Sequence, residues 1–414
     1  MIVRMGRWLA AMLVVALGSA GPGWAQTPPP APAPAAGEKK AEDKKDEKPK
    51  TLWDEFKLSA FIEMGATFSL HGGSTGVLGS TSTGPTNLLR LYDIDQGYTF
   101  NLGEFGIKRD PDEAFPFGMG LVLTAGQDSQ KNHSIGILRK ETDLFPFRDA
   151  AWFDLQEAYI SARIPIGDGP VLKVGKFVTL LGSEVIESPS NLNYSRGYLF
   201  TLAIPLTHTG ALLSYSFTDW LSAQAGVVMG WDRSDLQNDG PSGTGQIAVT
   251  PIKDLPIALN FIVGPERSGD RNPLRWVVDV TAGYTGIKDV TLGLNFDYGR
   301  QDNDVFLTSQ GLDKSAQWYG IAGYVAYDFL KDFRVALRQE WFRDVDGVRT
   351  ATAGGTTLLS TTGTLQYNIW KGLFARGEYR HDSADEKVFG CRPDLGCEKK
   401  SQDTISLSLY YKFF

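Results

Sequence analysis

The sequence lacks the marks of several large protein classes. No apolar run among its 414 residues reaches the roughly 18 residues that a membrane-spanning helix needs. Only two Cys and four His are present, which excludes a disulfide-scaffold miniprotein and a Cys-rich zinc protein. Aromatic residues, in contrast, make up 12% of the chain, so disorder of the whole chain is excluded as well.

The first 25 residues are typical of a secretory signal peptide. Arg4 and Arg7 precede an apolar run from Trp8 to Leu17, and small residues at 23 and 25 flank Trp24. We expect cleavage after Ala25 and leave residues 1–25 out of the fold.

Residues 26–52 form a segment of different composition. They hold six Pro and five Ala, then six Lys against five acidic residues. Such a composition buries too little apolar surface to fold, which predicts a disordered periplasmic linker. Two interpretations stay open: a solvated tether, or a segment whose lysines contact an anionic cell-wall polymer.

Net charge argues against nucleic acid as a partner. The chain carries −7 in total, and the signal peptide and linker together contribute +3. Residues 53–414 therefore carry −10, whereas a nucleic-acid-binding domain needs a basic surface.

From Trp53 onward the apolar residues recur with a period of two. In 57–69, 291–301 and 404–413 one face is apolar and the other polar. Alternation over about ten residues predicts β-strands with one apolar face. In a membrane barrel that face points to lipid, and the polar face lines the lumen.

The connections favour a barrel over a soluble sandwich. Short turns at 219, 254, 289, 332 and 372 alternate with long polar stretches such as 180–205 and 383–402. Short turns on one side and long loops on the other are typical of outer-membrane barrels. Five Trp near strand ends fit the aromatic girdles of such barrels: Trp220, Trp276, Trp318, Trp341 and Trp370.

We therefore predict an all-β fold, a transmembrane antiparallel up-and-down barrel of about 16 strands, with 14 to 18 open, spanning residues 53–414. The expected strands are 57–69, 97–108, 116–127, 153–164, 171–179, 206–218, 220–231, 245–251, 256–264, 274–286, 290–301, 315–328, 332–342, 357–368, 372–382 and 403–414.

One stretch resembles a known family. The motifs Gly175–Glu187, Asn193–Phe200, Pro205–Gly210 and Gly230–Asp232 are similar to those of the beta-barrel porin-2 family of bacterial outer-membrane proteins. The resemblance is specific over roughly 170–235 and diffuse elsewhere. It implies a barrel and a channel, without a defined substrate. Phe414 is similar to the C-terminal aromatic signal of outer-membrane proteins, although Lys412 departs from that pattern.

Alternation places six charged residues on one lumen wall. Arg334, Arg338 and Glu340 share a strand face, and Arg376, Glu378 and Arg380 share another two strands on. These rows would lie roughly 10 Å apart. Two interpretations stay open: a positive stripe that selects solutes by charge, or an internal salt-bridge lattice.

The third long loop, 180–205, is our candidate for the constriction. The likeness to general porins implies that it folds into the lumen, opposite the arginine wall. Its Glu184, Glu187 and Arg196 would then help to set a transverse field. The alternative is a loop packed on the rim with its charges in solvent.

No motif predicts an enzyme. His71, His133, His208 and His381 all map to the loop side or its rim, and no Gly-x-Ser-x-Gly elbow is present. We interpret His208 as a hydrogen-bonding rim residue, and Asp232–Gly240 as a solvated loop without EF-hand spacing. Cys391 and Cys397 predict a disulfide in an exported protein, and we expect neither cofactor nor metal.

These observations predict a Gram-negative outer-membrane porin for passive diffusion of small hydrophilic solutes or ions. The alternative is a structural or adhesive barrel that anchors the envelope through residues 26–52, with a barrel hydrolase a distant third. The expected partners are outer-membrane lipid and the diffusing solutes. The sequence leaves open whether the chain forms a homo-oligomer, which solute it passes and which ion it prefers.

Overall fold

The computed structural model describes residues 55–70, 89–92, 97–138, 151–235, 240–267, 269–304, 307, 315–392 and 396–413. The expected signal peptide and the 26–52 linker lie outside the described residues, as do His71 and Phe414.

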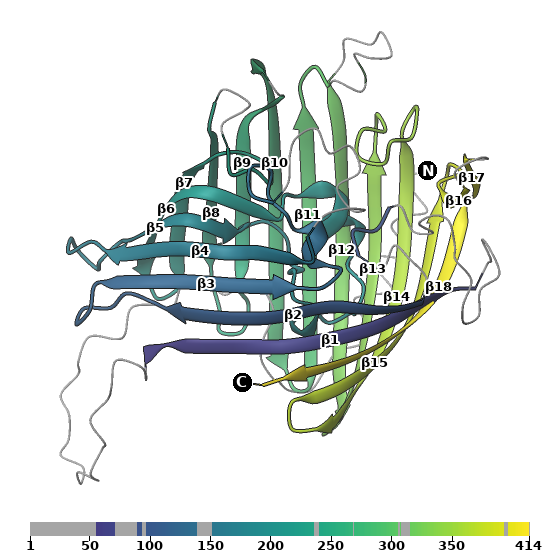
Figure 1. Cartoon of the computed structure of the whole chain (residues 1–414), viewed down its shortest axis with the longest axis horizontal. Helices are drawn as coiled ribbons and strands as arrows, with labels where there is room; N and C mark the ends of the chain where they lie inside the picture. The colour runs from purple at the N-terminus through teal and green to yellow at the C-terminus, as the bar shows by residue number, and fades with distance from the viewer. Residues whose placement is uncertain are drawn as a thin grey trace.

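The described chain is built almost wholly from β-strands (Figure 1). The barrel strands are β1 (Lys57–Ser69), β2 (Gly97–Arg109), β3 (Phe117–Ala125), β4 (Phe153–Arg163), β5 (Val171–Val178), β6 (Thr207–Thr218), β7 (Leu221–Val228), β8 (Ser242–Val249), β9 (Ile257–Arg267), β10 (Asp270–Ile287), β11 (Val290–Gln301), β12 (Ala316–Leu330), β13 (Phe333–Asp344), β14 (Thr356–Trp370), β15 (Leu373–Ala384) and β18 (Ser401–Lys412).

These strands close into one antiparallel barrel of sixteen. Each pairs with its neighbour in the chain, and β18 pairs with β1 to complete the ring. Figure 1 shows the sheet passing in chain order from purple β1 through teal and green to yellow β18. The predicted fold class and all sixteen predicted strands are confirmed, with most boundaries shifted by a few residues.

The period of two has the expected physical meaning. In β1, Ile62 and Met64 are 40% and 54% exposed on the outside, whereas Glu63 between them is 0% exposed. Apolar side chains therefore cover the outer wall, which faces lipid in a membrane, and polar side chains point into the lumen.

The short turns are set by local backbone chemistry. Asp254, Asp289 and Gly372 adopt φ values of 71°, 61° and 77°, in the left-handed region that Asp and Gly tolerate best. At Gly372 a Cβ would lie 2.4 Å from the carbonyl oxygen of Lys412, so only glycine fits. The Lys-Asp and Lys-Gly pairs thus fix these turns.

Aromatic residues ring the outer wall at two levels. One row, near the long loops, links Trp276, Tyr298, Tyr319 and Trp341 through ring contacts of 5.3–6.1 Å. The other, near the short turns, links Tyr327, Phe329, Phe333 and Tyr367.

Trp318 does not belong to these girdles. Its side chain is 0% exposed and points into the lumen, so the prediction for this residue was wrong. Trp318 shares the inward face of β12 with Ala322, whereas girdle residue Tyr319 occupies the outward face. Position near a strand end does not decide which way the side chain points.

Within the predicted 383–402 loop the chain forms a further hairpin, β16 (Phe389–Arg392) and β17 (Gly396–Lys399). Short helical turns are η2 (Ser129–Lys131), η3 (Ser188–Ser190) and η4 (Leu199–Ala203). In the described part of the chain no helix is long and apolar enough to cross a membrane.

Candidate functional site: the inner loop and its lumen wall

The connection between β5 and β6 lies inside the barrel and contacts the predicted charged wall. We call residues 180–205 the inner loop. On the wall, Arg338 of β13, Thr362 of β14 and Arg380 of β15 are direct cross-strand neighbours. The predicted grouping of the six charged residues on β13 and β15 follows from this register.

Two wall arginines bind the inner loop directly. Arg338 Nη1 lies 2.5 Å from Glu184 Oε1 and 2.6 Å from the carbonyl oxygen of Ser195. Arg380 Nη1 donates to the carbonyl oxygen of Arg196 at 2.6 Å. Both guanidinium groups are buried, so these charge-assisted bonds replace hydration.

The other two arginines lie closer to the short turns. Arg376 donates through Nη1 and Nη2 to the carbonyl oxygen of Ser188, at 3.0 Å each. Arg334 instead forms a pair with Asp328 of β12, at 2.7 and 2.8 Å, in which each side chain is about a third exposed. Three of the four guanidinium groups thus bind the inner loop, and Arg338 and Arg380 both reach the Ser195 hydroxyl, at 3.5 and 3.4 Å.

The wall glutamates bind the backbone of the same loop. Glu340 accepts the N–H groups of residues 198–199 at 2.7 Å each. Glu378 accepts those of residues 194–195 at 2.7 and 3.0 Å. We call these two side chains the carboxylate clamps. Each supplies the acceptors that buried N–H groups require.

The transverse-field interpretation expected the inner loop to lie opposite the arginine wall, across the lumen. The loop instead packs directly against that wall. Glu184 contacts Arg338 directly, while Glu187 accepts a hydrogen bond from Gln156 of β4, on another part of the wall. Arg196 turns back onto its own loop, donating to the carbonyl oxygens of residues 185, 186 and 194.

Further contacts tie the loop to the first strands. Asn101 of β2 donates to the Tyr194 hydroxyl at 3.0 Å, and the Ser188 hydroxyl donates to Glu63 of β1 at 3.1 Å. Glu63 also accepts from Ser408 of β18 at 2.7 Å. The inner loop therefore reaches across the lumen to several sides of the barrel.

Sequence reasoning missed several of these partners, although the signal was present for some. Glu63 stands on the polar face of an alternating strand, so the same argument that selected Glu340 selects it too. Asn101 and Gln156 carry no such distinctive signal, because neutral polar residues are common on lumen faces. Their roles follow only from where the inner loop lies.

On the side of the long loops, other segments cover the inner loop. Arg90 pairs with Asp382 of β15 at 2.7 Å, and Asp382 also binds Arg380 at 2.8 Å. Burial raises the pKa of the Tyr198 hydroxyl well above its ordinary value, so this group is neutral. The guanidinium of Arg380 lies 4.9 Å from the Tyr198 ring centroid.

Arg349, in the loop after β13, binds the inner loop from the same side. Its Nε donates to the carbonyl oxygen of Leu202 at 2.5 Å. Burial lowers the pKa of Arg349 to about 10, and the nearby Arg275 acts in the same direction. The group therefore keeps its charge at neutral pH.

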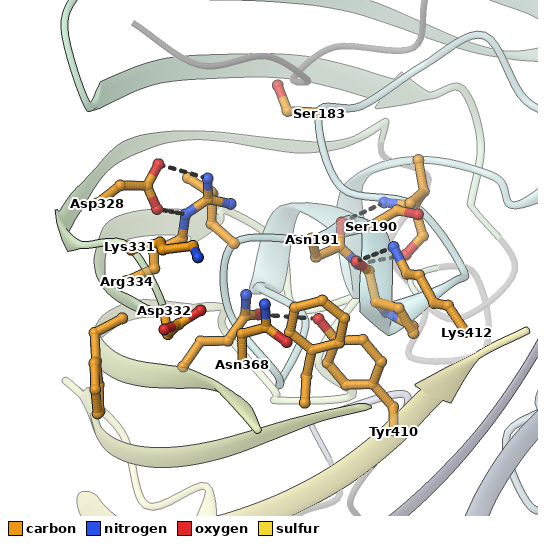
Figure 2. A pocket seen from close by; sticks show the side chains of 16 residues that line it. Ser183, Ser190, Asn191, Asp328, Lys331, Asp332, Arg334, Asn368, Tyr410 and Lys412 are labelled. Carbon is orange, nitrogen blue, oxygen red and sulfur yellow. Dashed lines mark hydrogen bonds and ion pairs between the residues drawn. The ribbon is translucent and has the colours of Figure 1, made fainter. Parts of the chain in front are cut away.

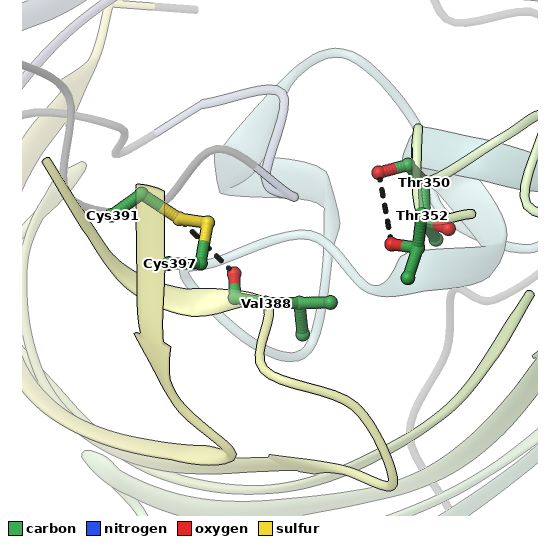
Figure 3. The surroundings of a disulfide bond; sticks show 5 residues. All are labelled: Thr350, Thr352, Val388, Cys391 and Cys397. Atoms are coloured by element: carbon green, nitrogen blue, oxygen red, sulfur yellow. Dashed lines mark hydrogen bonds between the residues drawn. A yellow bond between two sulfur atoms is a disulfide. The ribbon is translucent and has the colours of Figure 1, made fainter. Parts of the chain in front are cut away.

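The hairpin β16–β17 carries the predicted disulfide, and Cys391 and Cys397 are bonded (Figure 3). Cys391 Sγ also lies 3.5 Å from the carbonyl oxygen of Val388. Val388 and Phe389 are buried in the same apolar cluster as residues of the inner loop. The hairpin thus packs onto the lumen contents.

Two cavities lie on the side of the short turns. One, of about 560 Å³, is bounded by the inner loop, the β12–β13 turn and β18 (Figure 2). Lys331 and Arg334 border it on one side and Lys412 on the other, where Lys412 Nζ donates to the carbonyl oxygen of Pro189 at 3.1 Å.

The second cavity, of about 480 Å³, lies beside β2, β4 and β5. Lys108, Lys173, Glu157 and Glu187 are among its lining residues. Both cavities therefore bear charges of both signs, since Asp328 and Asp332 also line the first.

The described histidines give no catalytic arrangement. Buried His208 lies 3.1 Å from Thr179 Oγ1 and 3.1 Å from the carbonyl oxygen of Gly230, which makes it a structural link. His133 binds the carbonyl oxygen of Phe153, and His381 binds Asp403 at 2.8 Å. Among the residues that the structure describes, no cluster of His, Cys and acidic side chains could hold a metal ion.

Asp232, interpreted from sequence as part of a solvated loop, has a structural role. Its Oδ1 accepts the backbone N–H groups of Leu206 and Thr207 at 2.7 and 2.9 Å. It thereby fixes the end of the inner loop where the chain enters β6, and the interpretation as solvent-facing was wrong for this residue.

Several solved structures of outer-membrane proteins are similar to this barrel. The outer membrane channel DcaP of Acinetobacter baumannii has a similar fold, with a TM-score of 0.56 and 11% identity, over 86% of this chain and 97% of that one. The anion-selective porin from Comamonas acidovorans gives 0.55 and 10%, over 86% and 99%. At such identities the likeness shows the fold alone.

OmpT of Vibrio cholerae, solved in a trimer form, is similar with a TM-score of 0.52 and 10% identity, over 86% of this chain and 99% of that one. No curated protein matches the sequence. Residues 55–413, in contrast, match a porin family across the whole barrel. The chain is a porin-like barrel of the cell outer membrane, and it belongs to the family described as "Putative beta-barrel porin-2, OmpL-like".

Proposed function

We propose that the protein is a channel for passive diffusion of small hydrophilic solutes or ions across the outer membrane, and that it is not an enzyme. The observation that carries this proposal is the polar interior of a closed sixteen-strand barrel, with charged cavities of about 560 and 480 Å³ beside the inner loop. Barrels of this size enclose an aqueous lumen rather than a packed core.

The inner loop is the constriction of this channel. It occupies the lumen between the charged wall and the first strands, so whatever crosses the barrel passes residues 184–196. Glu184, Glu187, Arg196 and the wall residues Arg338, Glu340, Arg376, Glu378 and Arg380 set the charge at that level, and Arg334 sets it near the turn side. Selectivity follows from how these opposite charges balance along the path.

Planar-bilayer recording tests the proposal. Protein purified from the outer membrane of an expressing host is compared with a variant that lacks residues 186–195. We expect discrete conductance steps from the variant, larger than those of the native protein. An unchanged conductance would contradict the constriction, and absence of steps from both proteins would contradict a channel.

The same recordings under a KCl gradient give the ion preference. Residues 53–414 carry a net charge of −10, which concentrates cations at the mouths, whereas the arginines favour anions at the throat. The sign of the reversal potential decides which of the two dominates.

A second function, a structural or adhesive barrel, is favoured by one observation: the inner loop is buried on nearly all sides. In that case residues 26–52 would tether the barrel to the cell wall. Binding of the protein to purified cell-wall polymer, lost when residues 26–52 are removed, would support it. Assembly into homo-oligomers is a further proposal, which analytical ultracentrifugation in detergent tests.

A further inference from the structure

The inner loop has almost no surface that could border open water. From Leu181 to Phe200 the only exposed residue is Ser190, with Val185 and Glu187 half-buried. These three residues line the two cavities on the side of the short turns. A loop that narrows an open pore exposes one face to water along its length. Residues 181–200 of this loop expose no such continuous face.

Apolar side chains from many strands of the barrel pack around the inner loop. Two clusters contain its side chains: Leu180, Leu181, Leu192, Tyr198, Leu199, Leu202, Ala203 and Ile204 in one, and Ile186 and Phe200 in the other. The wall contributes Leu212, Val228, Ile262, Val277, Trp318, Phe342, Leu358, Phe61 and Leu102. These residues come from β1, β2, β6, β7, β9, β10, β12, β13 and β14, so the loop is packed on most of the circumference.

A further layer covers the loop on the side of the long loops. Leu89, Trp231, Val388 and Phe389 are buried in the same cluster. They come from three different connections, those after β1, β7 and β15, so segments far apart in the sequence meet above the inner loop. The two cavities of about 560 and 480 Å³ lie on the turn side of this layer, and their linings include charged residues of both signs.

We infer that the inner loop is a gate, closed in this structure, and that the carboxylate clamps Glu340 and Glu378 hold it shut. This inference rests on the proposed channel function and adds how passage is controlled. Each clamp fixes two consecutive backbone N–H groups within residues 194–199, the part of the loop that crosses the wall. Release of the clamps frees that crossing segment.

A substitution at Gly197 would displace the carboxylate of one clamp, Glu340. A Cβ at this position would lie 2.6 Å from Glu340 Oε1 and 2.9 Å from Oε2. In Gly197→Ala the carboxylate must therefore move, and it loses its hydrogen bonds to residues 198–199. The matched control is Gly363→Ala on the outward face of β14, where a Cβ meets nothing within 4 Å.

The experiment measures single-channel conductance of four proteins in planar bilayers: native, Gly197→Ala, Gly363→Ala, and the deletion of 186–195. We expect the native protein and Gly363→Ala to be closed for most of the recording. Gly197→Ala should open at least ten times as often, and the deletion should conduct continuously. Glu378→Gln, which weakens the other clamp, should act like Gly197→Ala and serves if that variant does not fold.

The outcomes separate the two proposals. If the native protein conducts continuously and at the level of the deletion, the inner loop is no gate and the inference is wrong. If the deletion conducts while Gly197→Ala and Glu378→Gln match the native protein, the clamps do not hold the gate. If the deletion gives no conductance although it folds, the channel function itself fails.

Discussion

Arg338 and Glu184 form an ion pair that is buried on both sides. Nη1 and Oε1 lie 2.5 Å apart, and the two side chains are 0% and 2% exposed. The second oxygen of Glu184 accepts the backbone N–H of Gly197 at 2.6 Å. The carboxylate of Glu184 thus joins Arg338 of the barrel wall to Gly197, in the middle of the crossing segment.

Glu184→Gln tests how much this ion pair contributes to the free energy of unfolding. The substitution keeps the side-chain size but leaves the Arg338 charge buried without its carboxylate, which costs about 3–5 kcal/mol in comparable pairs. The free energy of unfolding, measured by urea titration in lipid vesicles, should fall by that order. The matched control is Arg334→Gln, because the Arg334–Asp328 pair is about a third exposed on each side. Pairs of that kind contribute about 0–1 kcal/mol, and equal losses in the two variants would contradict the argument.

Alternation alone predicted the barrel well, because the lipid and the lumen impose opposite demands on successive residues. The alternate positions Arg334, Arg338 and Glu340 necessarily share one face of β13 once that strand is recognised. The short turns were also predictable, since Asp289 and Gly372 are residues that tolerate a left-handed backbone.

The contents of the lumen were less predictable. Nothing in the sequence of residues 180–205 states which wall the loop packs against, because loop contacts are set by three-dimensional closure of the barrel. For this reason Glu184, which was predicted to face the arginines across the lumen, is instead in direct contact with Arg338. The hairpin of β16 and β17 was missed because its strands are only four residues long.

The disulfide should stabilise the hairpin rather than the barrel. Cys391 and Cys397 enclose a short segment, and closing a loop of that size contributes about 2 kcal/mol in the chain-entropy model. In the double variant Cys391→Ser, Cys397→Ser, we expect faster protease cleavage within 383–402 and an unchanged melting temperature of the barrel. Alkylation of the native protein should label no thiol until a reductant is added. Labelling without reductant would contradict the bond.

Asp385 gives a pH prediction outside the membrane-spanning strands. Partial burial opposes ionisation, but hydrogen bonds from Thr357 N and Thr356 Oγ1, both 2.7 Å, outweigh it and lower the pKa of this carboxyl. A depressed pKa means that its contribution to stability is complete above the ordinary carboxyl pKa of about 3.9 and is lost as the pH falls through the folded value. The difference in unfolding midpoint between the native protein and Asp385→Asn should therefore persist at pH 5 and shrink toward pH 3. A difference independent of pH would refute this.

Trp318 should matter through its hydrogen bond as well as its volume. Its Nε1–H donates to the carbonyl oxygen of Ala203 at 3.1 Å, and its ring meets Trp231 edge to face at 6.4 Å. Trp318→Phe keeps an aromatic ring but leaves the Ala203 carbonyl unpaired, which costs about 1–3 kcal/mol. Trp318→Ala also opens a cavity, and such truncations cost about 3–5 kcal/mol.

The matched control for Trp318 is Trp370, which is 65% exposed on the outer wall. In detergent micelles Trp370→Phe should change the free energy of unfolding by no more than about 0.5 kcal/mol, as surface substitutions do. Because Trp318 holds the backbone just before β6, its Phe variant should also expose the inner loop to protease added from the loop side, and Trp370→Phe should not. Equal protease sensitivity in the two variants would show that the indole N–H has no part in fixing the loop.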